Sequence, residues 1–222
     1  MTLRRRVWGT VIGTVVSLGA LAYAELSLPA QPLISDYALV SGGLVPILIG
    51  MLALAGACLS LAYGLVASEP SRTAAARVLL LAAAAGLMMS AIFPTDPGTS
   101  QIGTLSGEIH RWSAAVVFTA LPVAGWSLAR RREAAPRWNA VRAMSVLAAL
   151  TLGVYLAAHP ASITSPLING VEYYGLLERG VVLADMALLM FMALASFAGR
   201  PVVRTEVAPV ERPVERQERL AA

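Results

Sequence analysis

Long apolar stretches separated by short polar ones are the main pattern along this chain. The stretches cover about residues 7–26, 43–66, 78–93, 106–129, 143–159 and 172–197. A helix needs about 20 apolar residues to cross a hydrocarbon core of roughly 30 Å. The third stretch is short, and we expect its helix to begin earlier, near Ala74, with Arg77 reaching back to the interface. The pattern predicts an all-α polytopic membrane bundle of six transmembrane helices.

The composition agrees with a membrane protein and excludes an ordinary soluble domain. Of 222 residues, 57% are apolar and only 14% are charged, whereas roughly a quarter of a soluble domain is charged. The transmembrane domain should occupy residues 1–198, which leaves no room for a soluble domain. Residues 199–222 alternate charges and carry few large apolar side chains, so we predict a disordered cytoplasmic tail.

The basic residues predict the orientation of the helices. All seventeen are arginines, and fifteen of them fall on one side of the six-helix map. These fifteen are Arg4, Arg5, Arg6, Arg72, Arg77, Arg130, Arg131, Arg132, Arg137, Arg142, Arg200, Arg204, Arg212, Arg216 and Arg219. Such asymmetry is the positive-inside pattern, so we expect a bacterial inner (plasma) membrane protein with both termini in the cytoplasm. Arginines beside membrane helices favour anionic lipids, and we expect no nucleic-acid partner.

Two further features of the apolar stretches bear on processing and redox chemistry. The sequence Ala22-Tyr23-Ala24 imitates a signal-peptidase site, but the preceding apolar run exceeds the usual 7–15 residues. We therefore expect an uncleaved first helix, with removal of residues 1–24 as the alternative. Cys58 is the single cysteine, which excludes an intrachain disulfide and a multi-cysteine metal site.

The two remaining arginines, Arg111 and Arg179, lie within predicted helices beside His110 and Glu178. Ionisable groups inside a membrane cost several kcal/mol unless they are paired or hydrated, so they are candidates for function. Glu108 stands three residues before Arg111 and could pair with it on the same helix. No such partner is evident for Arg179 in the sequence.

Polar residues recur on one face of the last predicted helix. Tyr174, Glu178 and Asp185 are spaced by four and seven residues, which places them on one side of an α-helix. On an otherwise apolar helix, this stripe should face the interior of the bundle. A functional site would explain this stripe. The alternatives are a buried clamp between Glu178 and Arg179 that fixes the helix register, and a protonated Asp185 hydrogen-bonded to a serine or threonine of a neighbouring helix.

A second candidate group combines Asp36, Asp96 and His110. A carboxylate can orient a histidine, which can then act as acid or base near neutral pH. Asp96 could equally orient the turn in which it lies. Zinc held by histidines and carboxylates, or one haem between His110 and His159, are weaker alternatives, and we expect no metal and no cofactor. The glycine-rich phosphate loops, zinc-protease and serine-hydrolase motifs do not occur.

These residues resemble a family of six-helix prokaryotic membrane proteins, domain of unknown function 998 (DUF998). The resemblance rests on the run 93–97 around Asp96, on Gly107, His110 and Phe118, on Ser35-Asp36, and on Gly175 with Glu178-Arg179, and it covers about residues 7–198. The likeness implies an uncleaved first helix and an outward-facing polar cluster. That family is similar in plan to eukaryotic six-helix proteins linked to lipid handling, but the likeness implies no established activity.

We therefore predict an outward-facing polar pocket that binds a lipid or lipid-like head group in an accessory or regulatory role. The candidate ligand-binding residues are Asp36, Asp96, His110, Arg111, Glu178, Arg179 and Asp185. Arg111 and Arg179 could hold a phosphate by forked hydrogen bonds.

Three other functions remain open at this point. The first is a membrane-embedded hydrolase or transferase on a lipid or isoprenoid, with His110, Asp96 and Glu178 as catalytic candidates. The second is a small proton-coupled carrier that uses Glu178 and Asp185, and the third is a purely structural partner protein. Membrane lipids, a second copy of the chain and another membrane protein are the expected partners.

Overall fold

The computed structural model of this protein describes residues 3–97 and 103–197. It contains six long α-helices and two short 3₁₀ turns. They are α1 (Leu3–Ser27), η1 (Ser35–Leu39), α2 (Leu44–Ser68), α3 (Ala74–Ile92), α4 (Leu105–Ala129), α5 (Pro136–Ala158), η2 (Ser165–Leu167) and α6 (Gly170–Phe197). All six α-helices are long and apolar enough to cross a membrane, and these residues contain no strand. The predicted all-α architecture is confirmed, while the tail 199–222 lies outside the described residues.

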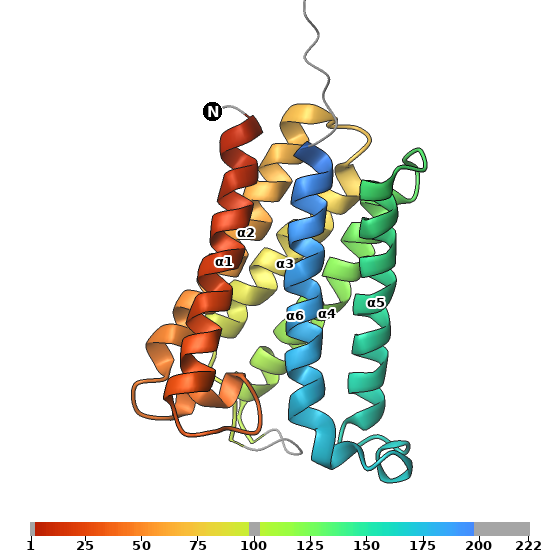
Figure 1. The fold of residues 1–222 in the computed structure, drawn as a ribbon. Helices are drawn as coiled ribbons and strands as arrows, with labels where there is room; N and C mark the ends of the chain where they lie inside the picture. The colour runs from red at the N-terminus through yellow and green to blue at the C-terminus, as the bar shows by residue number, and fades with distance from the viewer. Residues whose placement is uncertain (1–2, 98–102, 198–222) are drawn as a thin grey trace, which may run out of the picture.

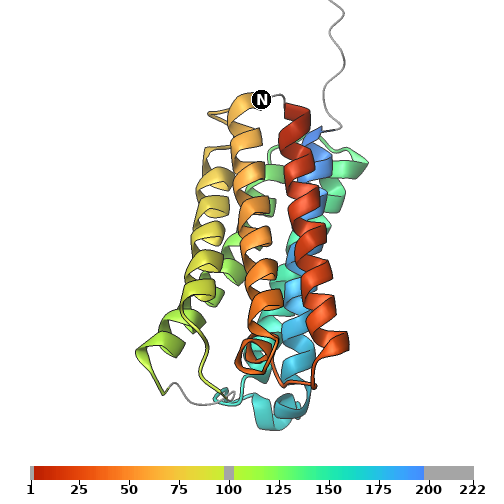
Figure 2. The same ribbon diagram turned by 90° about the vertical axis from the view of Figure 1, so that its left-hand side faces the viewer.

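The helices pack as a closed bundle in which each helix contacts the next along the chain and α6 returns to contact α1. Helix α6 also contacts α2 and α4, so it borders most of the interior. Figure 2 shows α1, α2 and α3 side by side on one face of the bundle.

The connections gather at two opposite ends of the bundle (Figure 1). One, here called the arginine end, holds the start of α1, the end of α6 and the loops 69–73 and 130–135. The other, here called the loop end, holds the loops 28–43 and 159–169, the end of α3 and the start of α4. Which end faces the cytoplasm remains the prediction made from the arginines.

Small residues let neighbouring helices approach closely. A Cβ atom on Gly13 of α1 would lie 2.7 Å from the carbonyl oxygen of Ala53 on α2. On α3, a Cβ atom on Gly86 would lie 2.8 Å from the carbonyl oxygen of Ser113 on α4. Such contacts are typical of membrane helices, because small residues allow two backbones to pack together.

The helix boundaries agree with the apolar pattern except at α5. Helix α3 begins at Ala74 as expected, but α5 begins at Pro136, not near residue 143. Proline is favoured at the first helical position, where its missing N–H costs nothing, and the residue before it is extended. The first turns of α5 therefore lie outside the apolar run, and from there Arg142 donates to the carbonyl of Ala129 at 2.8 Å.

The polar stripe on the last helix faces the interior, as predicted. Tyr174, Glu178 and Asp185 are all buried, with relative exposures of 5%, 8% and 2%. Cys58 on α2 is fully buried. The bundle interior therefore contains two carboxyl groups from α6, Glu178 in its loop-end half and Asp185 near its middle.

Candidate functional site

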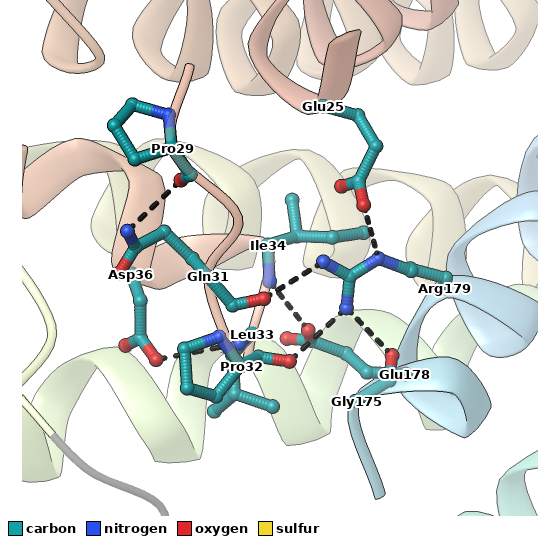
Figure 3. Close-up of polar contacts among 10 residues, drawn as sticks. All are labelled: Glu25, Pro29, Gln31, Pro32, Leu33, Ile34, Asp36, Gly175, Glu178 and Arg179. Atoms are coloured by element: carbon teal, nitrogen blue, oxygen red, sulfur yellow. Dashed lines mark hydrogen bonds and ion pairs between the residues drawn. The ribbon is translucent and has the colours of Figure 1, made fainter. Parts of the chain in front are cut away.

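Arg179 holds the loop between α1 and α2 against α6 (Figure 3). Its Nε donates to Oε1 of Glu25 at 2.9 Å. Its Nη1 donates to the carbonyls of Pro32 and Gly175 at 3.0 and 2.9 Å, and its Nη2 donates to the carbonyl of Gln31 at 3.0 Å. The negative group that Arg179 faces is therefore Glu25, near the end of α1.

The neighbouring Glu178 anchors the same loop from the buried side. Its Oε2 accepts a hydrogen bond from the backbone N–H of Ile34 at 2.7 Å. One turn earlier on α6, a Cβ atom at Gly175 would lie only 2.0 Å from the carbonyl oxygen of Pro32. Only glycine lets the loop approach the helix this closely, so Gly175, Glu178 and Arg179 act together as a loop anchor.

Asp36 lies inside this anchored loop, in the first turn of η1. Its Oδ2 accepts from the N–H of Leu33 at 3.3 Å, while its Oδ1 is buried without a partner among the described residues. Burial raises the pKa of the Asp36 carboxyl, and the Leu33 bond and the charges of His110 and Arg179 partly offset that rise. Asp36 is thus electrostatically linked to both residues.

Asp96 caps the start of α4. Its Oδ2 accepts from the N–H groups of Gly103 and Thr104 at 2.8 and 2.9 Å, and its Oδ1 accepts from the Thr104 hydroxyl at 2.8 Å. Thr104 is the N-cap of α4 and accepts from the N–H of Gly107. The bonds from Thr104 and Gly103 lower the pKa of the Asp96 carboxyl. The structure places Asp96 as a capping residue rather than as the partner of His110.

His110 is oriented by carbonyl groups of α3 instead. Its Nδ1 lies 3.0 Å from the carbonyl oxygen of Ser90 and 2.9 Å from that of Phe93. A carbonyl oxygen can only accept, so Nδ1 carries the hydrogen, and whenever the ring is neutral its Nε2 is an acceptor. The ring is buried and lines two neighbouring cavities.

A cavity of about 90 Å³ lies inside the bundle toward the loop end. Its walls come from α1, α2, α3, α4, α6 and the segment around η1, and are mainly apolar. The polar side chains that line it are Ser17, Ser35, Ser90, His110, Glu178 and Asp185. Helix α5 contributes no residue to these walls.

Two other cavities adjoin this central one. A space of about 300 Å³ lies between η1, α2 and the end of α3, and shares Ser90 and His110 with the central cavity. A space of about 200 Å³ lies between α1 and α6, beside the ion pair of Glu25 with Arg179, and shares Leu21 with the central cavity. The interior is therefore flanked by hollows on two sides, each between helices.

Arg111, on α4, interacts electrostatically with Asp96 and with a group of side chains on α5 and α6. There, the hydroxyl of Tyr174 donates to that of Tyr155 at 2.7 Å, the two rings stack at 4.6 Å, and His159 meets Tyr174 edge-on. Burial, and then the charge of Arg111, lower the pKa of His159. The structure describes both Arg111 and Glu108 and shows no ion pair between them, so that predicted pairing is wrong.

The family model of a “Protein of unknown function (DUF998)” matches residues 9–195. The chain belongs to the DUF998 family. The resemblance inferred from the sequence is thereby confirmed, and this DUF998 chain is a multi-pass helical membrane protein. No curated protein and no solved structure matches it.

The structure divides the candidate residues of this DUF998 protein into separate groups. His110, Glu178 and Asp185 line the central cavity. Asp36 lies in the anchored loop, and Arg179 holds that loop from α6. Asp96 caps α4, and Arg111 interacts electrostatically with the aromatic group around His159. The seven residues therefore do not form one site. Within the part of the chain that the structure describes, no group of three His, Cys, Asp or Glu residues could hold a metal ion.

Sequence reasoning did not assign a site role to three residues that border these groups. Ser17 and Ser90 line the central cavity, and Tyr155 pairs with Tyr174. In the sequence, Ser17 was marked only by its small size, and one hydroxyl on an apolar helix does not by itself indicate a binding site. Tyr155 had no distinguishing signal, because tyrosines are common near the ends of membrane helices.

Proposed function

We propose that this DUF998 protein binds a lipid or lipid-like molecule within the bundle, in an accessory or regulatory role in the bacterial inner membrane. The observation that carries the proposal is the central cavity, with mainly apolar walls and the polar groups of His110, Glu178 and Asp185. Binding sites for small amphiphiles combine mostly apolar walls with a few polar groups that fix orientation. In the proposed orientation this cavity lies in the outer half of the membrane.

The route into the cavity would run sideways from the membrane. The two flanking hollows lie between α2 and α3 and between α1 and α6, and both share residues with the central cavity. A molecule dissolved in the bilayer could enter between helices without first crossing the aqueous phase. Its apolar chain would contact side chains such as Leu54, Val117 and Leu121.

Arg179 is not available to hold a phosphate in this arrangement. Four hydrogen bonds already occupy its guanidinium, to Glu25 and to three backbone carbonyls. Binding a phosphate there would require the α1–α2 loop to be released. Arg111 stands apart from the central cavity and is the remaining candidate for an anionic group at the loop end.

Filling the cavity tests the proposal directly. The full-length protein is purified in native-membrane nanodiscs, and co-purified lipids are quantified by mass spectrometry. Ala114 lines the cavity, so Ala114→Phe should displace the bound molecule. The matched control is Ala115→Phe, one residue further on α4 and outside the cavity walls. Equal lipid content in both variants and the wild type would refute binding in this cavity.

His110 supports a second candidate function, a membrane-embedded hydrolase or transferase acting on a lipid or isoprenoid. Its Nε2 is fixed as an acceptor beside the cavity by the carbonyls of Ser90 and Phe93. A neutral imidazole in this state can take a proton from a substrate hydroxyl or water. Turnover in nanodiscs that is abolished by His110→Gln, with unchanged thermal stability, would favour this function over simple binding.

A further inference from the structure

Asp185 on α6 and Ser17 on α1 carry polar atoms that are buried without partners. Asp185 is 2% exposed, and neither of its carboxyl oxygens has a hydrogen-bond partner among the described residues. Ser17 is fully buried, and its Oγ also has no partner there. Both residues line the central cavity, from two helices that contact each other, α1 and α6.

Such groups are unusual in a folded protein. Buried polar atoms are nearly always hydrogen-bonded, and each exception calls for an explanation. Asp185 stands fifteen residues into α6, roughly 22 Å along the helix at 1.5 Å per residue. It is therefore far from both membrane surfaces. A carboxylate at this depth costs several kcal/mol unless a donor or a cation accompanies it. An ionised carboxylate can only accept hydrogen bonds, so a donor, and above all a cationic one, is the partner that would let Asp185 ionise at this depth.

The other polar groups around the cavity also favour a positively charged donor. Glu178 contributes a second carboxyl group, and His110 presents an acceptor nitrogen. No arginine lines the central cavity within the described residues, because Arg179 is turned toward Glu25 and the loop carbonyls. The cavity therefore contains acids and acceptors without a matching cation.

We propose that Asp185 and Ser17 bind a primary ammonium group at the end of an apolar chain. This inference rests on the proposed function and names the ligand class as an amphiphilic amine. The ammonium group donates to the Asp185 carboxylate and to the Ser17 hydroxyl oxygen, and its third hydrogen is directed toward the Glu178 side of the cavity. The chain lies against the apolar walls and leaves through a flanking hollow.

Binding of radiolabelled dodecylamine to the full-length protein in nanodiscs tests the inference, with empty nanodiscs subtracted to remove partitioning into lipid. The wild type should show saturable binding that unlabelled dodecanol displaces poorly. Asp185→Asn keeps the shape but removes the charge, and should weaken binding by about tenfold or more, as expected for a lost charge-assisted hydrogen bond. Glu172→Gln, an exposed acid on the same helix, is the matched control and should bind like the wild type.

The outcomes separate the inference from the proposed function. If Asp185→Asn binds dodecylamine like the wild type, or if dodecanol competes equally well, the ammonium site is refuted while the lipid cavity stands. If neither compound binds the wild type saturably, the lipid cavity itself is refuted. If Asp185→Asn does not fold, Ser17→Ala provides the same test, with several-fold weaker dodecylamine binding expected and unchanged binding as the refuting result.

Discussion

The close approach of the α1–α2 loop to α6 depends on a single glycine, and Gly175→Ala tests it. The added methyl group would lie 2.0 Å from the carbonyl oxygen of Pro32 and 3.1 Å from its carbonyl carbon. These are backbone atoms, which cannot rotate away as a side chain can. The loop must therefore move off the helix, and the hydrogen bond from Ile34 to Glu178 and those of Arg179 are stretched or lost.

The expected cost follows from these contacts. Overpacking a tight contact typically costs about 1–3 kcal/mol, and losing a hydrogen bond to a charged group costs about 1.5–3 kcal/mol. Alanine regains up to about 1 kcal/mol in a helix relative to glycine. The net loss in the free energy of unfolding should be about 2–4 kcal/mol, which corresponds to a fall in Tm of roughly 5–15 °C for a chain of this size.

The assay can use the single cysteine of the chain. Cys58 is fully buried, so a thiol-reactive dye reports unfolding in detergent or nanodiscs. The matched control is Gly180→Ala on the same helix, where an added Cβ atom would meet nothing within 4 Å. Its Tm should stay the same or rise slightly, because alanine is the better helix former. Equal melting of Gly175→Ala and Gly180→Ala would show that the loop is not held against α6 at this point.

Three further predictions concern the charged residues around the loop end. Arg179→Gln should lower the free energy of unfolding by about 1.5–3 kcal/mol through loss of its charge-assisted hydrogen bonds, whereas the exposed Arg130→Gln should melt like the wild type. The pKa of Asp96 is lowered by Thr104 and Gly103, so its stabilising contribution is present above the ordinary carboxyl pKa and is lost as the pH falls through the lowered value. The Tm difference between wild type and Asp96→Asn should thus be wide near neutral pH and narrow near about pH 3, and a constant difference would contradict the capping role. The raised pKa of Asp36 has the opposite effect on stability, because Asp36 ionises at a lower pH in the unfolded chain than in the folded one. The wild type should lose stability relative to Asp36→Asn as the pH rises from about 4 through the raised pKa of the folded state, and a gap that grows in favour of the wild type would contradict burial of this carboxyl.

The apolar pattern of the sequence predicts where α3 begins but not where α5 begins. The expectation that α3 reaches back to Ala74 was correct, because a shorter helix could not cross the hydrocarbon core. The start of α5 was missed because its first turns, with Arg137 and Arg142, are polar. Those turns are stabilised by proline at the first helical position and by the hydrogen bond from Arg142 to the carbonyl of Ala129.

The sequence pattern does not predict the hydrogen-bond partners of Asp96 and Arg179. Asp96 lies at the family motif, and its sequence position allowed either a turn or a partner for His110. The hydrogen bonds that Asp96 accepts from Gly103 and Thr104 show that it orients the turn before α4. Arg179 was recognised as unusual, but its partner Glu25 stands 154 residues away along the chain. Only the packing of α1 beside α6 brings the two together.

By itself, the sequence determined the number of membrane helices, the grouping of the arginines at one end and the inward-facing stripe of Tyr174, Glu178 and Asp185. These features depend on the cost of placing polar groups in lipid, which acts on each helix separately. The tertiary structure decided which helices are neighbours, and therefore which acid is a cap, which is a loop anchor and which lines the cavity. Lipid is as apolar as the bundle interior, so the apolar pattern hardly distinguishes one face of a membrane helix from another. The partners of each polar group consequently become visible only once the helices are packed.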